Sequence, residues 1–144
     1  MFELNDWQNK AAQQRFIDRA LIAGCAVAAV DGATFAVHNP ATNQLLANVA
    51  ACGAADVELA VQAARQSFDA GSWSRCAPSA RKEVLLKLSE LILANRDELA
   101  LLDSLSMGKP VMDAYNIDVP GAAGVFRWYA ESIDKLYDQV APSA

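Results

Sequence analysis

The spacing of hydrophobic residues changes once along the chain, close to Gly53. Before that point, short apolar runs alternate with turn formers, and the runs cover residues 21–29, 35–38 and 45–52. Ala23-Gly24, Asp31-Gly32 and the HNPATNQ stretch favour tight turns because Gly, Asn and Pro occupy them readily. The pattern predicts a small antiparallel β region over residues 21–52. A short amphipathic helix or an ordered arm is expected over residues 1–20.

Beyond Gly53 the apolar residues recur every three to four positions, which is typical of helices with one apolar face. Helices are expected up to Asp69, from Pro78 to Asn95, from there to Gly108, and from Pro110 onward. An interruption is expected at residues 118–121, with Asp118 as a cap and Pro120 in the first turn of a last helix. Residues 53–144 are therefore predicted to be helical. The predicted fold class is helix-rich α+β, with several amphipathic helices on a small antiparallel sheet.

The stretch LLDSLSMGKP, residues 101–110, is the junction of this helical region. Its Gly-Lys pair suggests a phosphate-binding loop, but that motif needs a glycine at the place of Asp103 and a hydroxyl at the place of Pro110. Gly108 is better explained as the residue that ends a helix in the left-handed conformation. The sequence therefore favours a helix cap over a nucleotide loop.

Composition narrows the class of protein. The 144 residues are 53% hydrophobic and carry a net charge of −5, so one domain, or a piece of a larger one, is expected. No basic surface of the kind that nucleic acid or an anionic membrane attracts is indicated. No apolar run reaches the length of a membrane span, and the N-terminus has no signal-peptide pattern, so a cytoplasmic location is expected.

Side chains that could carry chemistry are scattered. Cys25, Cys52 and Cys76 have no CxxC spacing, which argues against a disulfide framework or a zinc site. Cys76 lies near Arg75, but a small apolar role is favoured because no base is predictably within its reach. The single histidine, His38, is expected at the surface. The aromatic run Phe126, Trp128, Tyr129 and Tyr137 is better explained as a packing face than as a stacking platform for bases.

Three segments, in this order, resemble the opening part of the aldehyde dehydrogenase superfamily. The most specific motifs are NP-x-T from Asn39, DV-x-x-AV-x-AA from Asp56, LD-x-L-x-x-GKP, and FRWYAE from Phe126. DVPGAA, IDKLY and the WQ-x-KA near the N-terminus resemble most closely the gamma-glutamyl-gamma-aminobutyraldehyde dehydrogenases of putrescine breakdown. The resemblance covers nearly the whole chain from about Leu21.

The resemblance implies the activity of the family, which is oxidation of an aldehyde to its acid with NAD or NADP. In the family, a cysteine thiolate attacks the carbonyl and a glutamate activates the water that releases the acid. The catalytic and cofactor-binding residues and the Rossmann strands lie in the part of the fold beyond these 144 residues. The 144-residue chain is therefore predicted to be an N-terminal fragment that is inactive alone and binds no cofactor. A homo-oligomer, or self-association through exposed apolar faces, is expected.

Two family features fall within the chain. Some members bind a monovalent cation through main-chain carbonyls that correspond to Val37 and His38, together with an acid whose place Ser106 occupies. The missing carboxylate makes cation binding doubtful. The helix from Asp118 lines the substrate entrance in the family, and the matching positions are Gly121 and Val125. Small residues there would leave room for a long or bulky aldehyde.

The sequence leaves a second hypothesis about the class of protein open. The leucine and aromatic stripes suit a helical protein-interaction module, and a remnant of a decayed gene would show the same partial resemblance. The reading frame beyond codon 144 separates these possibilities. An in-frame Rossmann segment followed by a cysteine favours the enzyme.

Overall fold

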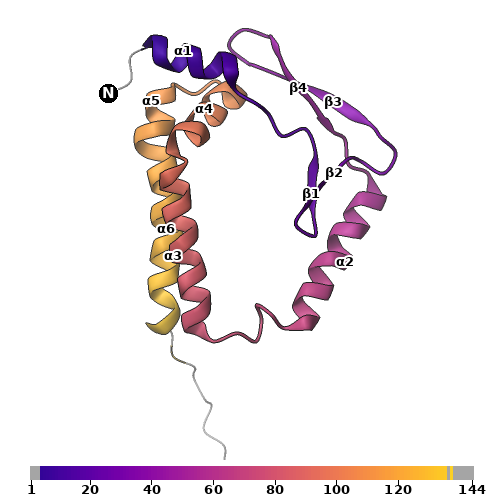
Figure 1. Cartoon of the computed structure of the whole chain (residues 1–144), viewed down its shortest axis with the longest axis vertical. Helices are drawn as coiled ribbons and strands as arrows, with labels where there is room; N and C mark the ends of the chain where they lie inside the picture. Colours follow the sequence, from indigo (N-terminus) through magenta and orange to yellow (C-terminus); the bar gives the residue numbers. More distant parts are fainter. Residues whose placement is uncertain (1–3, 136, 138–144) are drawn as a thin grey trace, which may run out of the picture.

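The chain folds into two β-hairpins and a set of helices, and this computed structural model describes residues 4–135 and residue 137 (Figure 1). The end expected for the last helix, at Ala141-Pro142, lies outside the described residues. The elements are α1 (Leu4–Gln13), β1 (Ala20–Ile22), β2 (Cys25–Val27), β3 (Thr34–His38), β4 (Leu45–Ala50), α2 (Ala54–Ala70), α3 (Pro78–Ala94), α4 (Arg96–Met107), α5 (Val111–Asp113), the π-helix η1 (Ala114–Asp118), α6 (Val119–Ser132) and the 3₁₀ turn η2 (Ile133–Lys135).

The helix-rich α+β class is confirmed, and the strands form two separate antiparallel hairpins. Ala23 and Gly24 join β1 to β2 with φ angles of 52° and 78°, so both turn residues adopt the left-handed conformation that favours a two-residue hairpin. β3 pairs with β4 from Thr34 opposite Ala50, and the register shifts between Val37 and His38. The division of the chain into a 1–20 arm and a 21–144 unit stays a prediction.

A buried aspartate connects the β region to the first long helix. Asp56, 3% exposed, lies in the first turn of α2. Its Oδ2 accepts a hydrogen bond from the Gly53 N–H, and its Oδ1 accepts one from the Val30 N–H, both at 2.8 Å. A carboxylate at this end of a helix also interacts favourably with the helix dipole. One side chain therefore ties the loop after β2 to the start of α2.

Helices α3 and α6 lie side by side and antiparallel (Figure 1). Ala123 and Ala130 are buried on α6, and side chains this small allow two helix backbones to approach closely. The buried Ser89 hydroxyl of α3 donates a hydrogen bond to the Ala123 carbonyl at 2.8 Å. Near the other end of the pair, the Lys82 ammonium lies 2.6 Å from the Asp134 carboxylate. The register of the pair is therefore set by polar contacts as well as by packing.

The interruption expected at residues 118–121 is wrong, because α5, η1 and α6 form one continuous helical segment, although Pro120 does lie in the first turn of α6 as expected. Asp118 has helical backbone angles and makes no capping hydrogen bond with its side chain. Pro120 instead changes the hydrogen-bond pattern one turn earlier. A proline ring clashes with the carbonyl four residues before it and has no N–H to donate. The π-helical turn accommodates both effects, and its Val119 N–H donates to the Ala114 carbonyl.

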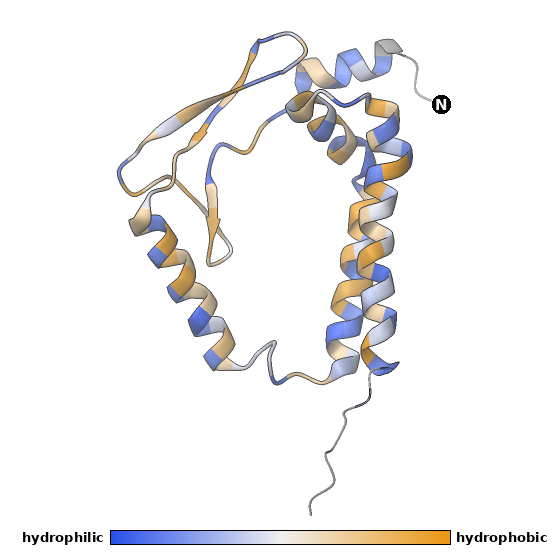
Figure 2. Cartoon of the chain, turned by 180° about the vertical axis from the view of Figure 1, so that it is seen from behind, coloured by the Kyte–Doolittle hydropathy of each residue, from blue (hydrophilic) through white to orange (hydrophobic). Residues whose placement is uncertain are grey.

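Much apolar surface stays exposed. Among the described residues, the buried hydrophobic set consists mainly of small side chains, and no large side chain is fully buried. The accessible surface is 10556 Å², against about 7,200 Å² expected for a compact protein of 15.4 kDa. Figure 2 shows hydrophobic residues along α2 and along α3 and α6. Val57, Val61 and Phe68, which recur at helical spacing along α2, are 57–60% exposed.

The Lys82–Asp134 pair predicts a pH dependence of stability. The hydrogen bond from Lys82, and then that from Lys135, lowers the pKa of Asp134 from 3.8 to about 2. Because the pKa is lower in the folded state, the carboxylate stabilises the fold fully above pH 3.8, and the contribution is lost as the pH falls towards 2. Asp134→Asn should therefore weaken the pH dependence of the free energy of unfolding in this window. Urea unfolding at several pH values measures it.

Asp69→Asn, which removes the same charge from an exposed carboxylate of α2, is the matched control. An acid dependence as steep in Asp134→Asn as in the control would contradict the prediction.

Candidate functional site

The junction at residues 101–110 is a helix end that is held by its own side chains. Gly108 has φ of 75°, and its N–H donates to the Ser104 carbonyl at 2.9 Å. The Ser104 hydroxyl donates to the Lys109 carbonyl at 2.7 Å. Leu101 is buried at the same helix. The predicted left-handed glycine cap is confirmed.

Two of the family-like motifs meet at this cap. A side-chain carbon added to Gly108 would lie 2.9 Å from Cγ of Pro40, so the proline of the NP-x-T turn packs directly against the glycine. The turn itself is well hydrogen-bonded: the Asn39 side-chain oxygen accepts from the Ala41 N–H at 2.9 Å. The structure therefore brings together residues that lie far apart in the sequence.

Lys109 leaves the cap and pairs with Asp118 across 2.5 Å. The hydrogen bond with Asp118 raises the pKa of the ammonium, and the nearby carboxylates of Asp103 and Asp113 add to this effect. A pocket of about 370 Å³ lies beside the pair, lined by Ile92, Leu99, Asp103, Asp118, Val119 and Ala122. The lysine is held by carboxylates, which does not suit a phosphate-binding role.

The predicted site residues occupy two regions. Gly121 and Val125 lie one turn apart on an exposed face of α6, and nothing lies within 4 Å of a side-chain carbon added to Gly121. Val37 and His38 lie on β3 at the register shift, just before the NP-x-T turn. Ser106 donates its hydroxyl hydrogen to the Leu102 carbonyl of its own helix at 2.7 Å. The roles of all five residues stay predictions.

The candidate nucleophiles and metal ligands are dispersed. Over residues 4–135 and 137, no group of three or more His, Cys, Asp or Glu side chains could hold a metal ion. Cys25, Cys52 and Cys76 are free thiols, and Cys76 donates to the Trp73 carbonyl at 3.1 Å. In the same part of the chain, none of the helices is both long and apolar enough to cross a membrane.

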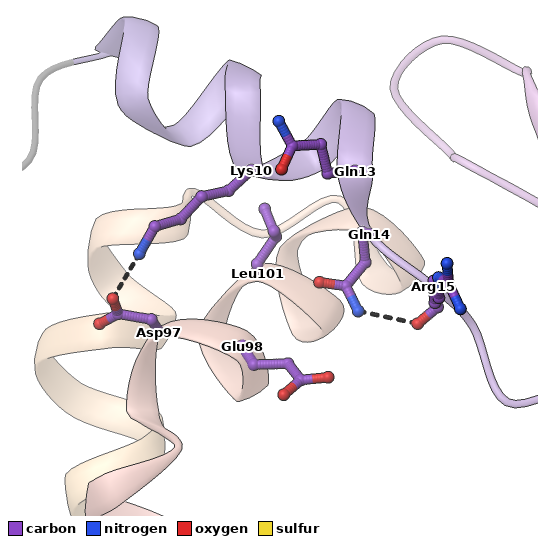
Figure 3. A pocket seen from close by; sticks show the side chains of 7 residues that line it. All are labelled: Lys10, Gln13, Gln14, Arg15, Asp97, Glu98 and Leu101. Atoms are coloured by element: carbon purple, nitrogen blue, oxygen red, sulfur yellow. Dashed lines mark hydrogen bonds and ion pairs between the residues drawn. The ribbon is translucent and has the colours of Figure 1, made fainter.

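Sequence reasoning missed a cluster in which α1 meets the junction region. The guanidinium of Arg96 lies 3.7 Å from the ring centroid of Tyr115, and the Trp7 ring contacts the Tyr115 ring edge to face at 5.7 Å. Lys10 of α1 pairs with Asp97 of α4, at the side of a groove of about 380 Å³ (Figure 3). The only sequence signals were the WQ-x-KA motif and an arginine after a helix cap, and neither indicates a partner.

Comparison with known proteins connects this geometry to a family. The family model described as the aldehyde dehydrogenase family matches residues 27–144. The chain is 43% identical over 138 residues to the NADP/NAD-dependent aldehyde dehydrogenase PuuC of Escherichia coli, and covers 28% of that protein. It is 45% identical to the aminoacetaldehyde dehydrogenase of Pseudomonas aeruginosa, of which it covers 29%. These two matches take in 96% and 99% of the chain.

The solved structures extend the likeness to the fold. The gamma-glutamyl-gamma-aminobutyraldehyde dehydrogenase of Burkholderia cenocepacia matches 99% of the chain with a TM-score of 0.96 and 48% identity. The chain therefore belongs to the aldehyde dehydrogenase family. It spans less than a third of the length of each of these relatives, 28% or 29%. The resemblance drawn from the sequence motifs is confirmed.

The meeting of the two motifs can be tested with a pair of glycine substitutions. Gly108→Ala should destabilise the fold by more than about 1 kcal/mol, because alanine is strained at positive φ and its methyl group would clash with Pro40. Gly24→Ala is the matched control, since Gly24 has a φ of 78° with nothing within 4 Å of an added carbon. Urea unfolding measures both variants. Equal losses of stability would show that the Pro40 contact contributes nothing.

Proposed function

We propose that these residues form part of an NAD- or NADP-dependent aldehyde dehydrogenase that oxidises an aldehyde to its carboxylic acid. The supporting observation is the match to a solved gamma-glutamyl-gamma-aminobutyraldehyde dehydrogenase, at 48% identity over 99% of the chain. A cytoplasmic enzyme that assembles as a homo-oligomer is part of this proposal. Within the proposed enzyme, the 144 residues supply scaffold and a substrate-entrance surface, whereas the reacting groups come from other parts of the fold.

The proposed substrate class is an aldehyde derived from an amine. Gamma-glutamyl-gamma-aminobutyraldehyde, from putrescine breakdown, is the first candidate. The relatives that are 45–48% identical to this chain include enzymes named for this substrate and for aminoacetaldehyde. Gly121 and Val125 are the proposed entrance positions. Gly121 has no side chain and lies on an open face of α6, which suits a long substrate. NAD and NADP are both candidate oxidants, as the name of the Escherichia coli relative includes both.

The activity is tested by supplying the full-length gene product with NAD⁺ or NADP⁺ and each of these two aldehydes, and following the absorbance of the reduced cofactor. Oxidation of either aldehyde is expected. The 144-residue polypeptide, assayed in parallel, should give no turnover above the rate without protein. No oxidation by the full-length product would refute the proposed activity, and turnover by the 144-residue polypeptide would refute its predicted inactivity.

The exposed apolar faces predict that the 144-residue polypeptide self-associates and binds a hydrophobic dye. Val61→Glu should reduce both effects, because it places a charge on the open face of α2. Gln62→Glu, which adds the same charge beside that face, is the control. Sedimentation velocity and dye fluorescence measure the outcome, and a compact wild-type monomer that binds no dye would count against it.

An interaction module remains the second candidate, since the same faces could dock another protein. The enzyme assay separates the two, because a binding module oxidises no aldehyde.

A further inference from the structure

Pro120 removes one backbone hydrogen-bond donor from the turn that follows η1. In η1 the Val119 N–H donates to the Ala114 carbonyl, following the π-helical pattern. The next N–H in that pattern would come from residue 120 and would reach the Tyr115 carbonyl, but proline has none. Val119, the α-helical donor for the same carbonyl, is already engaged. The Tyr115 carbonyl therefore needs a donor from outside its own helix.

Arg96 supplies that donor from α4. Its Nε lies 2.6 Å from the Tyr115 carbonyl oxygen, and its Nη2 lies 3.4 Å from the side-chain oxygen of Asn116. The guanidinium also stacks on the Tyr115 ring at 3.7 Å. One half-buried side chain thus contacts the backbone, a polar side chain and the ring of consecutive π-helical residues. Lysine could not reproduce this set, because its ammonium is neither planar nor forked.

The π-helical turn determines which residues of α6 face α3. It holds one residue more than an α-helical turn, so every later side chain is rotated by about 100° relative to an uninterrupted α-helix. With this turn in place, Val119, Ala123 and Ala130 are buried, while Gly121 and Val125 face outward. Without the π-helical turn, other residues of α6 would take the outward positions of Gly121 and Val125.

We propose that Arg96 is a positioning residue. Its hydrogen bond replaces the one that Pro120 cannot make, and this keeps Gly121 and Val125, the proposed entrance residues, on the outward face of α6. The contacts around η1 support this positioning role independently of any enzymatic activity. Its catalytic consequence rests on the proposed function, because only an aldehyde dehydrogenase would use Gly121 and Val125 as a substrate entrance. Arg96 would touch neither substrate nor cofactor.

The test is a double-mutant cycle in the full-length gene product, with Arg96→Met, Pro120→Ala and the combination. Pro120→Ala provides the N–H that proline lacks, and in the π-helical pattern this N–H reaches the Tyr115 carbonyl, which should then no longer depend on Arg96. Hydrogen exchange of the amides of residues 118, 119 and 121 and the kinetics of aldehyde oxidation are measured for each variant. Arg65→Met, which removes an equal charge from the surface of α2, is the matched control.

Arg96→Met alone should speed amide exchange at residues 118, 119 and 121 by about tenfold or more, because it leaves a carbonyl without a donor. It should lower kcat/KM for the aldehyde by about tenfold, mostly through KM, since the entrance and not the reacting groups is displaced. Both effects should be much smaller in the Pro120→Ala background. A merely structural role would reduce the folded fraction, and hence the apparent kcat, and leave KM unchanged.

The proposal is overturned if the amides of Arg96→Met exchange no faster than those of Arg65→Met. It is also overturned if the effects of Arg96→Met on exchange and on kcat/KM are equally large with and without Pro120. If Arg96→Met does not fold, Arg96→Lys replaces it in both backgrounds with the same expected pattern. If the wild-type protein oxidises no aldehyde, the proposed function fails, and amide exchange still decides whether Arg96 holds the π-helical turn.

Discussion

The missing N–H of Pro120 is the constraint that shapes the segment between α5 and α6. It disfavours an ordinary α-helical turn before Pro120, and the structure has a π-helical turn there. The same missing donor leaves a carbonyl that Arg96 of α4 reaches. The aromatic ring beside that carbonyl then receives Trp7 from α1. The contacts around Tyr115 therefore link η1 to α4 and to the N-terminal helix.

Local signals explain why so much of the fold could be predicted. Hairpin turns, helix ends and the glycine cap at Gly108 depend on the φ preferences of a few residues, and these are visible in the sequence. Asn95 separates α3 from α4 as expected, although its side chain donates back to the Leu91 carbonyl. The interruption near Pro120 was wrong because a sequence shows that a hydrogen bond is missing without showing how the chain compensates.

Contacts between distant residues explain what could not be predicted. Asp56 suggested a helix start, but nothing in the sequence showed that its second oxygen accepts from Val30. Arg96 resembled any surface arginine until the helix that carries Tyr115 was placed beside it. The motifs of the candidate site were recognised by resemblance, and only the structure shows that Pro40 packs on Gly108.

Small residues at the contact between α3 and α6 explain how these two helices pack closely while large apolar side chains stay exposed. Ala123 and Ala130 let α3 and α6 approach closely, so the pair is held by backbone proximity and the Ser89 hydrogen bond, with little burial of large side chains. The large apolar side chains that would normally form a core, such as Phe68 and Trp128, remain exposed on the outer faces. In the proposed enzyme these faces are contact surfaces. If the proposed function holds, the exposed Gly121 would lie at the substrate entrance, next to the buried small residues that hold α6 against α3.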